Sequence, residues 1–188
     1  MNFHYFFTRK LNLIKQSDAL VALPGGFGTM EEIYESITLI QTGKATIFPI
    51  ILLDTPEETF WKRWYNFVFK ELLEAGLISK EDMFLLYPCK SAEAAYQHIA
   101  RFYSRFHSYY YDGPQIVIRM NSALSEDNLD WCRHDFADII EKGDLAQQDN
   151  DPADPDPRRG CLPRVRFTFA MRNFARLRQM IDQINDAV

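Results

Sequence analysis

The residues most able to do chemistry lie in one stretch, DALVALPGGFGTMEEIYE, at positions 18–35. It opens with a short apolar run over 19–23, which has the length of a buried strand. The glycine-rich segment that follows, 24–28, lets backbone N–H groups approach a ligand without interference from Cβ atoms. Thr29 is a good N-cap for the helix expected next. A strand, a glycine loop and a helix N-terminus together favour phosphate binding, because free N–H groups and the helix dipole converge there.

Charged residues flank this loop on both sides. Glu31 and Glu32 are expected in the first turn of the helix, where the dipole favours carboxylates. Exposure to solvent is a sufficient explanation for Glu31. A carboxylate at Glu32 would be repelled by a bound phosphate, which indicates a function such as holding a sugar hydroxyl or stabilising an oxocarbenium-like centre. Arg9 and Lys10 are the natural counter-charges, since a guanidinium binds phosphate in a bidentate fork and keeps a nearby carboxylate ionised. An ordinary basic helix face is an equally good interpretation of that pair.

The loop differs from the two common nucleotide-binding loops. No lysine follows its last glycine, as a Walker A motif requires, and its spacing is not GxGxxG. A nucleoside triphosphatase and an NAD enzyme are therefore not favoured, and a plain strand-to-helix turn is the alternative. The four histidines are scattered and the three cysteines lie far apart, so we expect no metal site. No lysine stands in a context that suggests pyridoxal phosphate, and we expect no cofactor.

Composition limits the class of protein. The 188 residues carry a formal net charge of −5, which argues against a general nucleic-acid binder. A hydrophobic content of 47% fits a globular domain with a sizeable core. No apolar run approaches the roughly 18 residues needed to span a bilayer. Three widely spaced cysteines suit a reducing compartment. We expect a cytoplasmic protein that binds neither nucleic acid nor membrane.

Apolar patterning predicts alternating strands and helices before residue 108. Continuous apolar runs are typical of parallel strands buried on both faces, and they occur at 19–23, 48–53 and 84–87. Helical spacing of apolar residues predicts amphipathic helices over 3–16, 30–42, 58–75 and 91–105. The fold class we expect is α/β, with a Rossmann-like parallel sheet flanked by helices.

The character of the sequence changes after His107. We expect a turn over 109–114, a strand over 115–120 and a helix over 125–142. After these we expect a loop over 147–163, a strand over 164–169 and a helix over 173–184. The two strands are expected to pair. The loop holds four Asp and four Pro and is expected to be irregular or disordered. Five arginines between 164 and 178 predict a basic patch, most simply a solvated face. This part is interpreted as a small α+β extension.

Three segments resemble the LOG (Lonely Guy) family of nucleotide phosphoribohydrolases, once mislabelled as lysine decarboxylases. PGGFGTMEE at 24–32 matches the family motif PGGxGTxxE, FFTRK at 6–10 resembles its Arg-Lys pair, and ESITLIQTGK at 35–44 resembles its next helix. The resemblance covers about residues 3–105. It implies a modified Rossmann fold that hydrolyses the N-glycosidic bond of a nucleoside 5′-monophosphate, of the AMP or cytokinin riboside monophosphate type. The products would be free base and ribose 5-phosphate, with no metal or pyridoxal cofactor.

The resemblance also implies roles for individual residues. Arg9 and Glu32 would be the catalytic pair, and Lys10 would assist in holding the 5′-phosphate. The other expected substrate-binding residues belong to the loop and the helix after it: Gly25, Gly26, Phe27, Gly28, Thr29, Glu31 and Thr38. Members of the family are homodimers or larger assemblies, with the site close to the subunit interface.

One departure from the family concerns the first half of the sheet. LOG proteins ordinarily have strands and a second glycine-rich segment before the Arg-Lys helix, and this sequence starts at that helix. We therefore expect 1–108 to be the C-terminal part of a LOG-type Rossmann domain. We expect 109–188 to be a C-terminal extension that contains the Pro/Asp-rich loop at 147–163. The alternative function is a non-catalytic nucleotide- or phosphate-binding module, or a truncated LOG-like protein.

Overall fold

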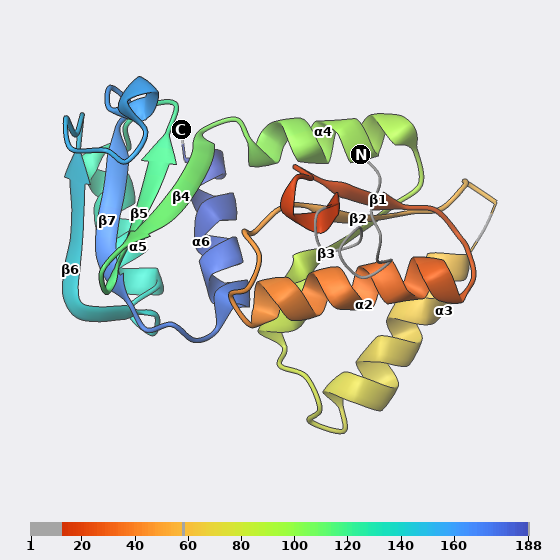
Figure 1. Ribbon diagram of the computed structural model, residues 1–188. Helices are drawn as coiled ribbons and strands as arrows, with labels where there is room; N and C mark the ends of the chain where they lie inside the picture. The colour runs from red at the N-terminus through yellow and green to blue at the C-terminus, as the bar shows by residue number, and fades with distance from the viewer. Residues whose placement is uncertain (1–12, 58, 188) are drawn as a thin grey trace, which may run out of the picture. The chain divides into compact units, whose positions relative to one another are not determined.

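The computed structural model describes residues 13–57 and 59–187, which divide into two compact units, up to Ile99 and from Ala100 onward (Figure 1). Each unit has its own sheet. The helix predicted over 3–16 lies largely outside the described residues, although 13–15 are helical. Along the described ranges, no helix combines the length and the apolar character needed to cross a membrane.

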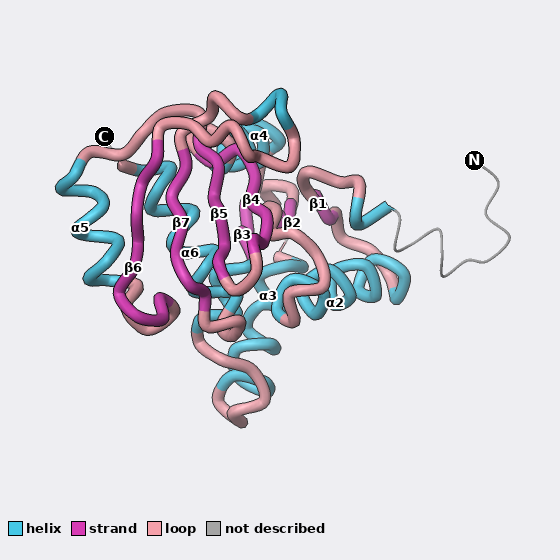
Figure 2. Tube along the Cα trace, turned by 60° about the vertical axis from the view of Figure 1, so that its left-hand side comes forward, coloured by secondary structure: helices cyan, strands magenta, loops and turns pink. Residues whose placement is uncertain are grey.

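The first unit contains a three-stranded parallel sheet in the order β1-β2-β3. Its strands are β1 (Leu20–Ala22), β2 (Ile50–Leu53) and β3 (Leu86–Cys89). Its helical segments are α2 (Phe27–Gln41), α3 (Phe60–Phe67), a π-helix (Val68–Leu73), a 3₁₀ helix (Glu81–Leu85) and α4 (Ala92–Phe102), whose last residues belong to the second unit. Helix α4 lies on one side of the sheet, and α2 and α3 lie on the other (Figures 1 and 2).

Burial on both faces makes β2 the centre of the first unit. Ile50, Ile51 and Leu52 are fully buried, as expected for a parallel strand covered by helices on each side. In the parallel register, Ile50 aligns with Leu20 on one side and with Leu86 on the other. The predicted α/β class is confirmed. The third strand starts two residues later than predicted, because 84 and 85 complete the preceding 3₁₀ helix.

The second unit contains a four-stranded antiparallel sheet in the order β4-β5-β7-β6. Its strands are β4 (Phe106–Asp112), β5 (Gln115–Met120), β6 (Ile140–Gln148) and β7 (Arg164–Phe169). Its helices are α5 (Glu126–Asp135), a short 3₁₀ turn (Pro157–Arg159) and α6 (Phe174–Asp186). The predicted pairing of 115–120 with 164–169 is confirmed by the β5–β7 ladder.

Two predictions for this unit were wrong. The segment 109–114 is mostly strand rather than turn, because β4 pairs with β5 as far as Asp112, and only Gly113 and Pro114 form the hairpin turn. Gly113 has φ of +57°, a left-handed conformation that glycine adopts without strain. The helix predicted over 125–142 ends at Asp135, and 140–148 is strand β6, because its backbone pairs with β7.

The two faces of the second sheet differ in chemistry. Alternation along β5 and β7 places Ile116, Ile118 and Phe167 on one face, where they are fully buried. Helix α6 supplies an apolar side to this core through residues that are all buried: Phe174, Leu177, Met180, Ile181 and Ile184. The opposite face carries Arg119 and Arg164, which are directly paired across the β5–β7 ladder and are also buried.

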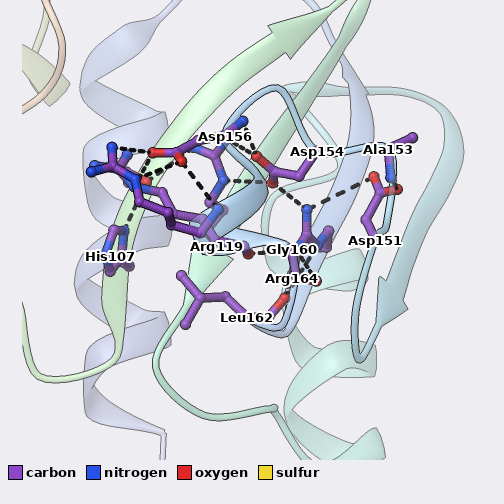
Figure 3. Close-up of polar contacts among 12 residues, drawn as sticks. His107, Arg119, Asp151, Ala153, Asp154, Asp156, Gly160, Leu162 and Arg164 are labelled. Atoms are coloured by element: carbon purple, nitrogen blue, oxygen red, sulfur yellow. Dashed lines mark hydrogen bonds and ion pairs between the residues drawn. The ribbon is translucent and has the colours of Figure 1, made fainter.

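Asp154 contacts both of these buried arginines, and Asp151 adds a second carboxylate 3.8 Å from Nη1 of Arg164 (Figure 3). Arg119 donates to both oxygens of Asp154, from Nε to Oδ2 at 2.8 Å and from Nη2 to Oδ1 at 2.6 Å. Arg164 donates from Nη1 to Oδ2 at 2.5 Å. These hydrogen bonds, those from Arg119 foremost, hold the pKa of Asp154 well below its usual range. We call Arg119, Asp154 and Arg164 the Asp154 cluster.

The cluster fixes the Pro/Asp-rich loop to the sheet. Asp154 belongs to the loop, and Nη2 of Arg164 also donates to three loop carbonyls, those of Arg159, Gly160 and Leu162. Of the two alternatives for 147–163, an irregular loop and a disordered linker, the structure therefore shows the loop, whose first two residues end β6. The predicted solvated basic patch was wrong for two of its five arginines, because Arg164 and the α6 residue Arg178 are buried. Their charges are balanced locally, with Arg178 donating to Asp182 at 3.0 Å.

One amide side chain ties the C-terminal helix to the start of β4. Oδ1 of Asn185 accepts from the backbone N–H groups of Arg105 at 3.0 Å and Phe106 at 2.7 Å. Its Nδ2 donates to the carbonyl of Phe102 at 2.6 Å. Three backbone groups between the end of α4 and the first residue of β4 are satisfied in this way.

Candidate functional site

The glycine loop lies at the carboxyl end of β1, where open parallel sheets bind their ligands. The helix α2 begins at Phe27, with Gly26 as N-cap in an extended conformation, and no side chain caps it. The prediction that Thr29 is the N-cap was wrong, because the N-cap is Gly26, three residues earlier. The first helical hydrogen bond runs from Met30 N–H to the carbonyl of Gly26 at 3.2 Å. The N–H groups of 27–29 thus have no helical acceptor and point out of the helix start.

The glycines of the loop fall into two kinds. A Cβ atom on Gly25 would lie 2.2 Å from Oγ1 of Thr29, so this position is closed to any side chain. The close approach brings the Thr29 hydroxyl back over the loop. At Gly26 and Gly28 a Cβ atom would meet no atom within 4 Å. Protein packing therefore does not explain these two glycines, and the space above them is open to a ligand.

The acidic residues follow the loop along α2. Glu32 is half-buried and lies one helical turn after Gly28, on the same side of the helix. Glu31 is exposed and lies one turn after Phe27, whose ring is almost fully exposed. Neither carboxylate belongs to the first turn, contrary to the prediction, because the helix starts at Phe27.

One predicted site residue, Thr38, lies away from the loop, and two others are not described. Thr38 is exposed near the end of α2, ten residues after Gly28, and therefore about 15 Å along the helix from the loop. Arg9 and Lys10 lie outside the described residues.

A pocket of about 730 Å³ opens beside the loop. Pro24, which immediately precedes Gly25, lines one part of it. The remaining lining comes from α3 and the segment before it: Glu57, Thr59, Phe60, Arg63, Trp64 and Phe67. We call this the α3 pocket. Its volume lies within the range of small-molecule sites in proteins, about 300–1,000 Å³.

Buried contacts hold the wall of the α3 pocket in place. Asp54, at the end of β2, accepts from the backbone N–H of Trp61 at 3.0 Å and so caps the start of α3. Trp61 is buried and packs edge-on against Trp64, with ring centroids 5.8 Å apart. Nε1 of Trp64 donates to the Tyr34 hydroxyl of α2 at 3.1 Å. The pocket wall is therefore joined to the helix that carries Glu32.

The sequence did not single out the α3 pocket. Apolar spacing over 58–75 predicted an amphipathic helix, and a helix does form there, but Phe60 and Phe67 are exposed rather than in the core. The helical spacing of apolar residues cannot distinguish an aromatic residue that packs in the core from one that lines a pocket. Arg63 and Glu57 carried no sequence signal beyond ordinary surface charge.

No group of three or more His, Cys, Asp or Glu side chains in the described part of the chain is placed to hold a metal ion. The arrangement instead offers backbone N–H groups, a hydroxyl and a carboxylate around an open loop. This defines an α/β unit of the class that binds an anion at a strand–glycine loop–helix turn.

The comparison with known families agrees with this class. A family model described as "Possible lysine decarboxylase", which is that of the LOG family, matches residues 1–99, more than half of the chain. The chain belongs to the LOG family. The match includes the loop and the α3 pocket, and it ends where the second unit begins.

Curated relatives carry the same family name. The chain is 38% identical over 85 residues to cytokinin riboside 5′-monophosphate phosphoribohydrolase LOG1 of Arabidopsis thaliana, covering 45% of this chain and 38% of the relative. It is 57% identical over 71 residues to LOG3 of the same plant, covering 38% and 31%. It is 60% identical over 35 residues to the probable enzyme LOGL1 of Oryza sativa subsp. japonica, covering 19% and 16%. The chain thus spans between 16% and 38% of the length of these three relatives.

Proposed function

We propose that this chain acts on nucleoside 5′-monophosphates, hydrolysing the N-glycosidic bond to give free base and ribose 5-phosphate. The observation that carries the proposal is the uncapped start of α2 after a glycine loop, with Glu32 one turn further on. The names of the relatives support it, since each is a phosphoribohydrolase of a riboside 5′-monophosphate.

The loop supplies the binding part of this reaction. The N–H groups of 27–29 and the Thr29 hydroxyl are donors suited to the 5′-phosphate. Open space above Gly26 and Gly28 lets phosphate oxygens approach the backbone closely. Binding there would place the ribose toward Glu32, because that residue shares a side of α2 with Gly28.

Glu32 supplies the chemical part. As the bond to the base breaks, positive charge develops on the ribose, and a nearby carboxylate stabilises that oxocarbenium-like centre. Water then adds to the anomeric carbon, and the base leaves with a proton. In this proposal Arg9 pairs with Glu32 and Lys10 assists the phosphate; both lie outside the described residues, and their roles rest on the motif alone.

Product analysis tests the proposal directly. The 188-residue chain is incubated with AMP, CMP and GMP, and free base and ribose 5-phosphate are quantified by chromatography. We expect both products in equal amounts, and their loss in Glu32→Ala. Glu74→Ala, an exposed carboxylate beyond the π-helix, is the matched control. Full activity in Glu32→Ala would refute the assignment.

Calorimetry with AMP separates hydrolysis from binding alone. Heat of binding without release of base, in a protein that keeps its thermal unfolding transition, would favour the alternative of a nucleotide-binding module. If the folded chain shows no binding of AMP and no turnover, both the hydrolase and the nucleotide-binding module are refuted.

We further infer a homodimer or larger assembly in a reducing, cytoplasmic compartment. The segment after α3 exposes three large apolar side chains, Phe69, Leu77 and Phe84, a pattern that favours a partner surface. All three cysteines are free, as in reducing compartments. Sedimentation velocity tests the assembly, with a monomer at micromolar concentration as the contrary result, and cell fractionation tests the compartment.

A further inference from the structure

Strand β4 of the second unit brings a histidine and a serine side chain into direct contact. In the ladder with β5, the pairing advances by two residues along β4, from Phe106 to Ser108, and by one residue along β5. Successive side chains of a regular strand point to opposite faces, and an extra residue interrupts this alternation. His107 is that extra residue, and its Nδ1 atom lies 2.9 Å from Oγ of Ser108. Bulges of this kind are frequent next to active sites, where they redirect a side chain.

The contacts of the Ser108 hydroxyl place its own proton toward His107. Nη1 of Arg119 donates to Oγ of Ser108 at 3.2 Å, and a guanidinium has no acceptor to offer in return. The proton of Oγ is therefore available to Nδ1 of His107, which accepts it when the imidazole is neutral. Burial, and then the positive charges of Arg159 and Arg119, lower the pKa of His107, and the carboxylate of Asp156 opposes this shift. The neutral imidazole is the form that can act as a base.

The guanidinium beside Ser108 is fixed in position before any reaction. Arg119 is buried and donates to both oxygens of Asp154, so its charge is held by the Asp154 cluster (Figure 3). A guanidinium stays protonated in proteins. A fixed positive charge next to a hydroxyl stabilises the alkoxide that forms when the proton leaves. Ser108 thus has a base on one side and a stabilising charge on the other.

Both side chains of the pair are half-buried, so each keeps some exposed surface. A serine within hydrogen-bond reach of a base is the arrangement from which nucleophilic catalysis starts. An anion-binding site fits the group less well, because Asp154 and Asp156 already pair with the arginines around it. The hydroxyl and the imidazole are the groups that these ion pairs leave available for chemistry.

We propose that Ser108 is a nucleophile that takes an acyl group from small activated esters, with His107 as its general base. Oγ attacks the ester carbonyl carbon while its proton passes to Nδ1 of His107. The bond from that carbon to the leaving oxygen breaks, and the leaving alcohol takes the proton from the imidazolium. Water then hydrolyses the acyl-serine by the same route and releases the carboxylic acid. The pair lies beyond the residues that the family model matches, and this activity does not depend on the proposed nucleotide hydrolysis.

Acetylation by p-nitrophenyl acetate tests the proposal on the full chain. Release of p-nitrophenolate is followed by absorbance at neutral pH, and the acetylated peptide is identified by mass spectrometry after acid quenching. We expect a burst stoichiometric with the chain and an acetyl group on Ser108. Ser108→Ala should abolish the burst, and His107→Gln should slow it about 10²- to 10⁴-fold, the usual contribution of a general base. Ser122→Ala is the matched control, because Ser122 is exposed and accepts from Arg105 at 3.0 Å but has no histidine beside it in the chain.

Two further measurements distinguish a nucleophile from a hydroxyl that only stabilises the fold. Ser108→Cys should form a thioester with the same reagent, because a thiol can replace the hydroxyl as nucleophile. The rate of the wild-type burst should fall as pH decreases, with a midpoint below 6.5, the ordinary pKa of histidine, since protonated His107 cannot accept the proton. Thermal unfolding of each variant checks that the fold is retained.

The contrary results are equally definite. No burst in the folded wild type, acetyl groups only on other residues, or an undiminished burst in Ser108→Ala overturns the proposal. An undiminished burst in His107→Gln overturns the role of the imidazole as base. Release of base from AMP is measured on the same samples, so failure of the esterase activity and failure of the nucleotide hydrolysis are read separately.

Discussion

Asp154 is expected to be the most sensitive position in the second unit. In Asp154→Asn, two buried guanidiniums lose the one carboxylate that both of them contact. The side chains of Arg164 and Asp154 are fully buried, so water does not replace the lost charge. Removing one partner of a buried ion pair costs about 3–5 kcal/mol. That loss corresponds to an unfolding equilibrium shifted about 10²- to 10⁴-fold.

Hydrogen exchange of the β5 and β7 amides, read by mass spectrometry on the full chain, measures this loss. At neutral pH we expect exchange to accelerate by that factor in Asp154→Asn. The control is Asp156→Asn, whose carboxylate pairs with Arg158 and Arg159 in the same loop, where the Arg158 side chain is highly exposed. Exchange in the control should stay close to that of the wild type. Equal, small effects in the two variants would refute the claim that the cluster stabilises the unit.

The pH dependence provides an independent check. Because the folded pKa of Asp154 lies below its ordinary value of 3.8, the ionised side chain stabilises the fold above that value. The stabilisation is lost as pH falls below about 4 toward the folded pKa, since the unfolded chain then takes up the proton first. The difference between wild type and Asp154→Asn should therefore be constant from pH 6 to 8 and should narrow below about pH 4. A difference that grew toward acid would contradict this assignment.

Three further predictions concern other sites. Gly25→Ala should lower both the melting temperature and the affinity for ribose 5-phosphate, because its Cβ would clash with Thr29, whereas Gly26→Ala should keep the melting temperature of the wild type. Asn185→Ala should cost about 1–3 kcal/mol in urea unfolding, since it leaves backbone groups at the start of β4 without partners, and an unchanged midpoint would be contrary. A thiol reagent at pH 8 should label exposed Cys161 and spare Cys132, because burial, with Asp135 nearby, raises the pKa of Cys132 to about 11; rapid labelling of Cys132 in folded protein would oppose this.

Local patterns were enough to predict the first unit. The apolar run ending in Leu53 predicted a strand buried on both faces, and the loop at 24–28 predicted a strand-to-helix turn, because both signals lie within a few residues. The start of α2 was misplaced by three residues, since either Thr29 or Gly26 can cap a helix and only the backbone conformation decides between them.

The second unit depends on partners distant in sequence. Strand β6 was not predicted, and its first residues, 140–142, were assigned to the preceding helix, because its strand state is imposed by pairing with β7, more than fifteen residues later. The arginines of β7 were taken as solvated because the acid that buries Arg164 lies in the irregular loop, whose composition resembles disorder. The α3 pocket was missed for a related reason: whether Phe60 faces a core or a cavity is decided by what packs around α3.

The strand order of the second unit also constrains how it can form during synthesis. Strand β7 lies between β5 and β6, yet it is the last strand to leave the ribosome. Until Phe169 has emerged, β5 and β6 both present unpaired edges, and only the β4–β5 hairpin can close. Open edges of this kind invite pairing with other chains. The nascent chain therefore passes through a stage in which the inner strand β7 is missing from the sheet. Slow or interrupted translation of 149–169 would prolong this stage, which is the one most prone to aggregation.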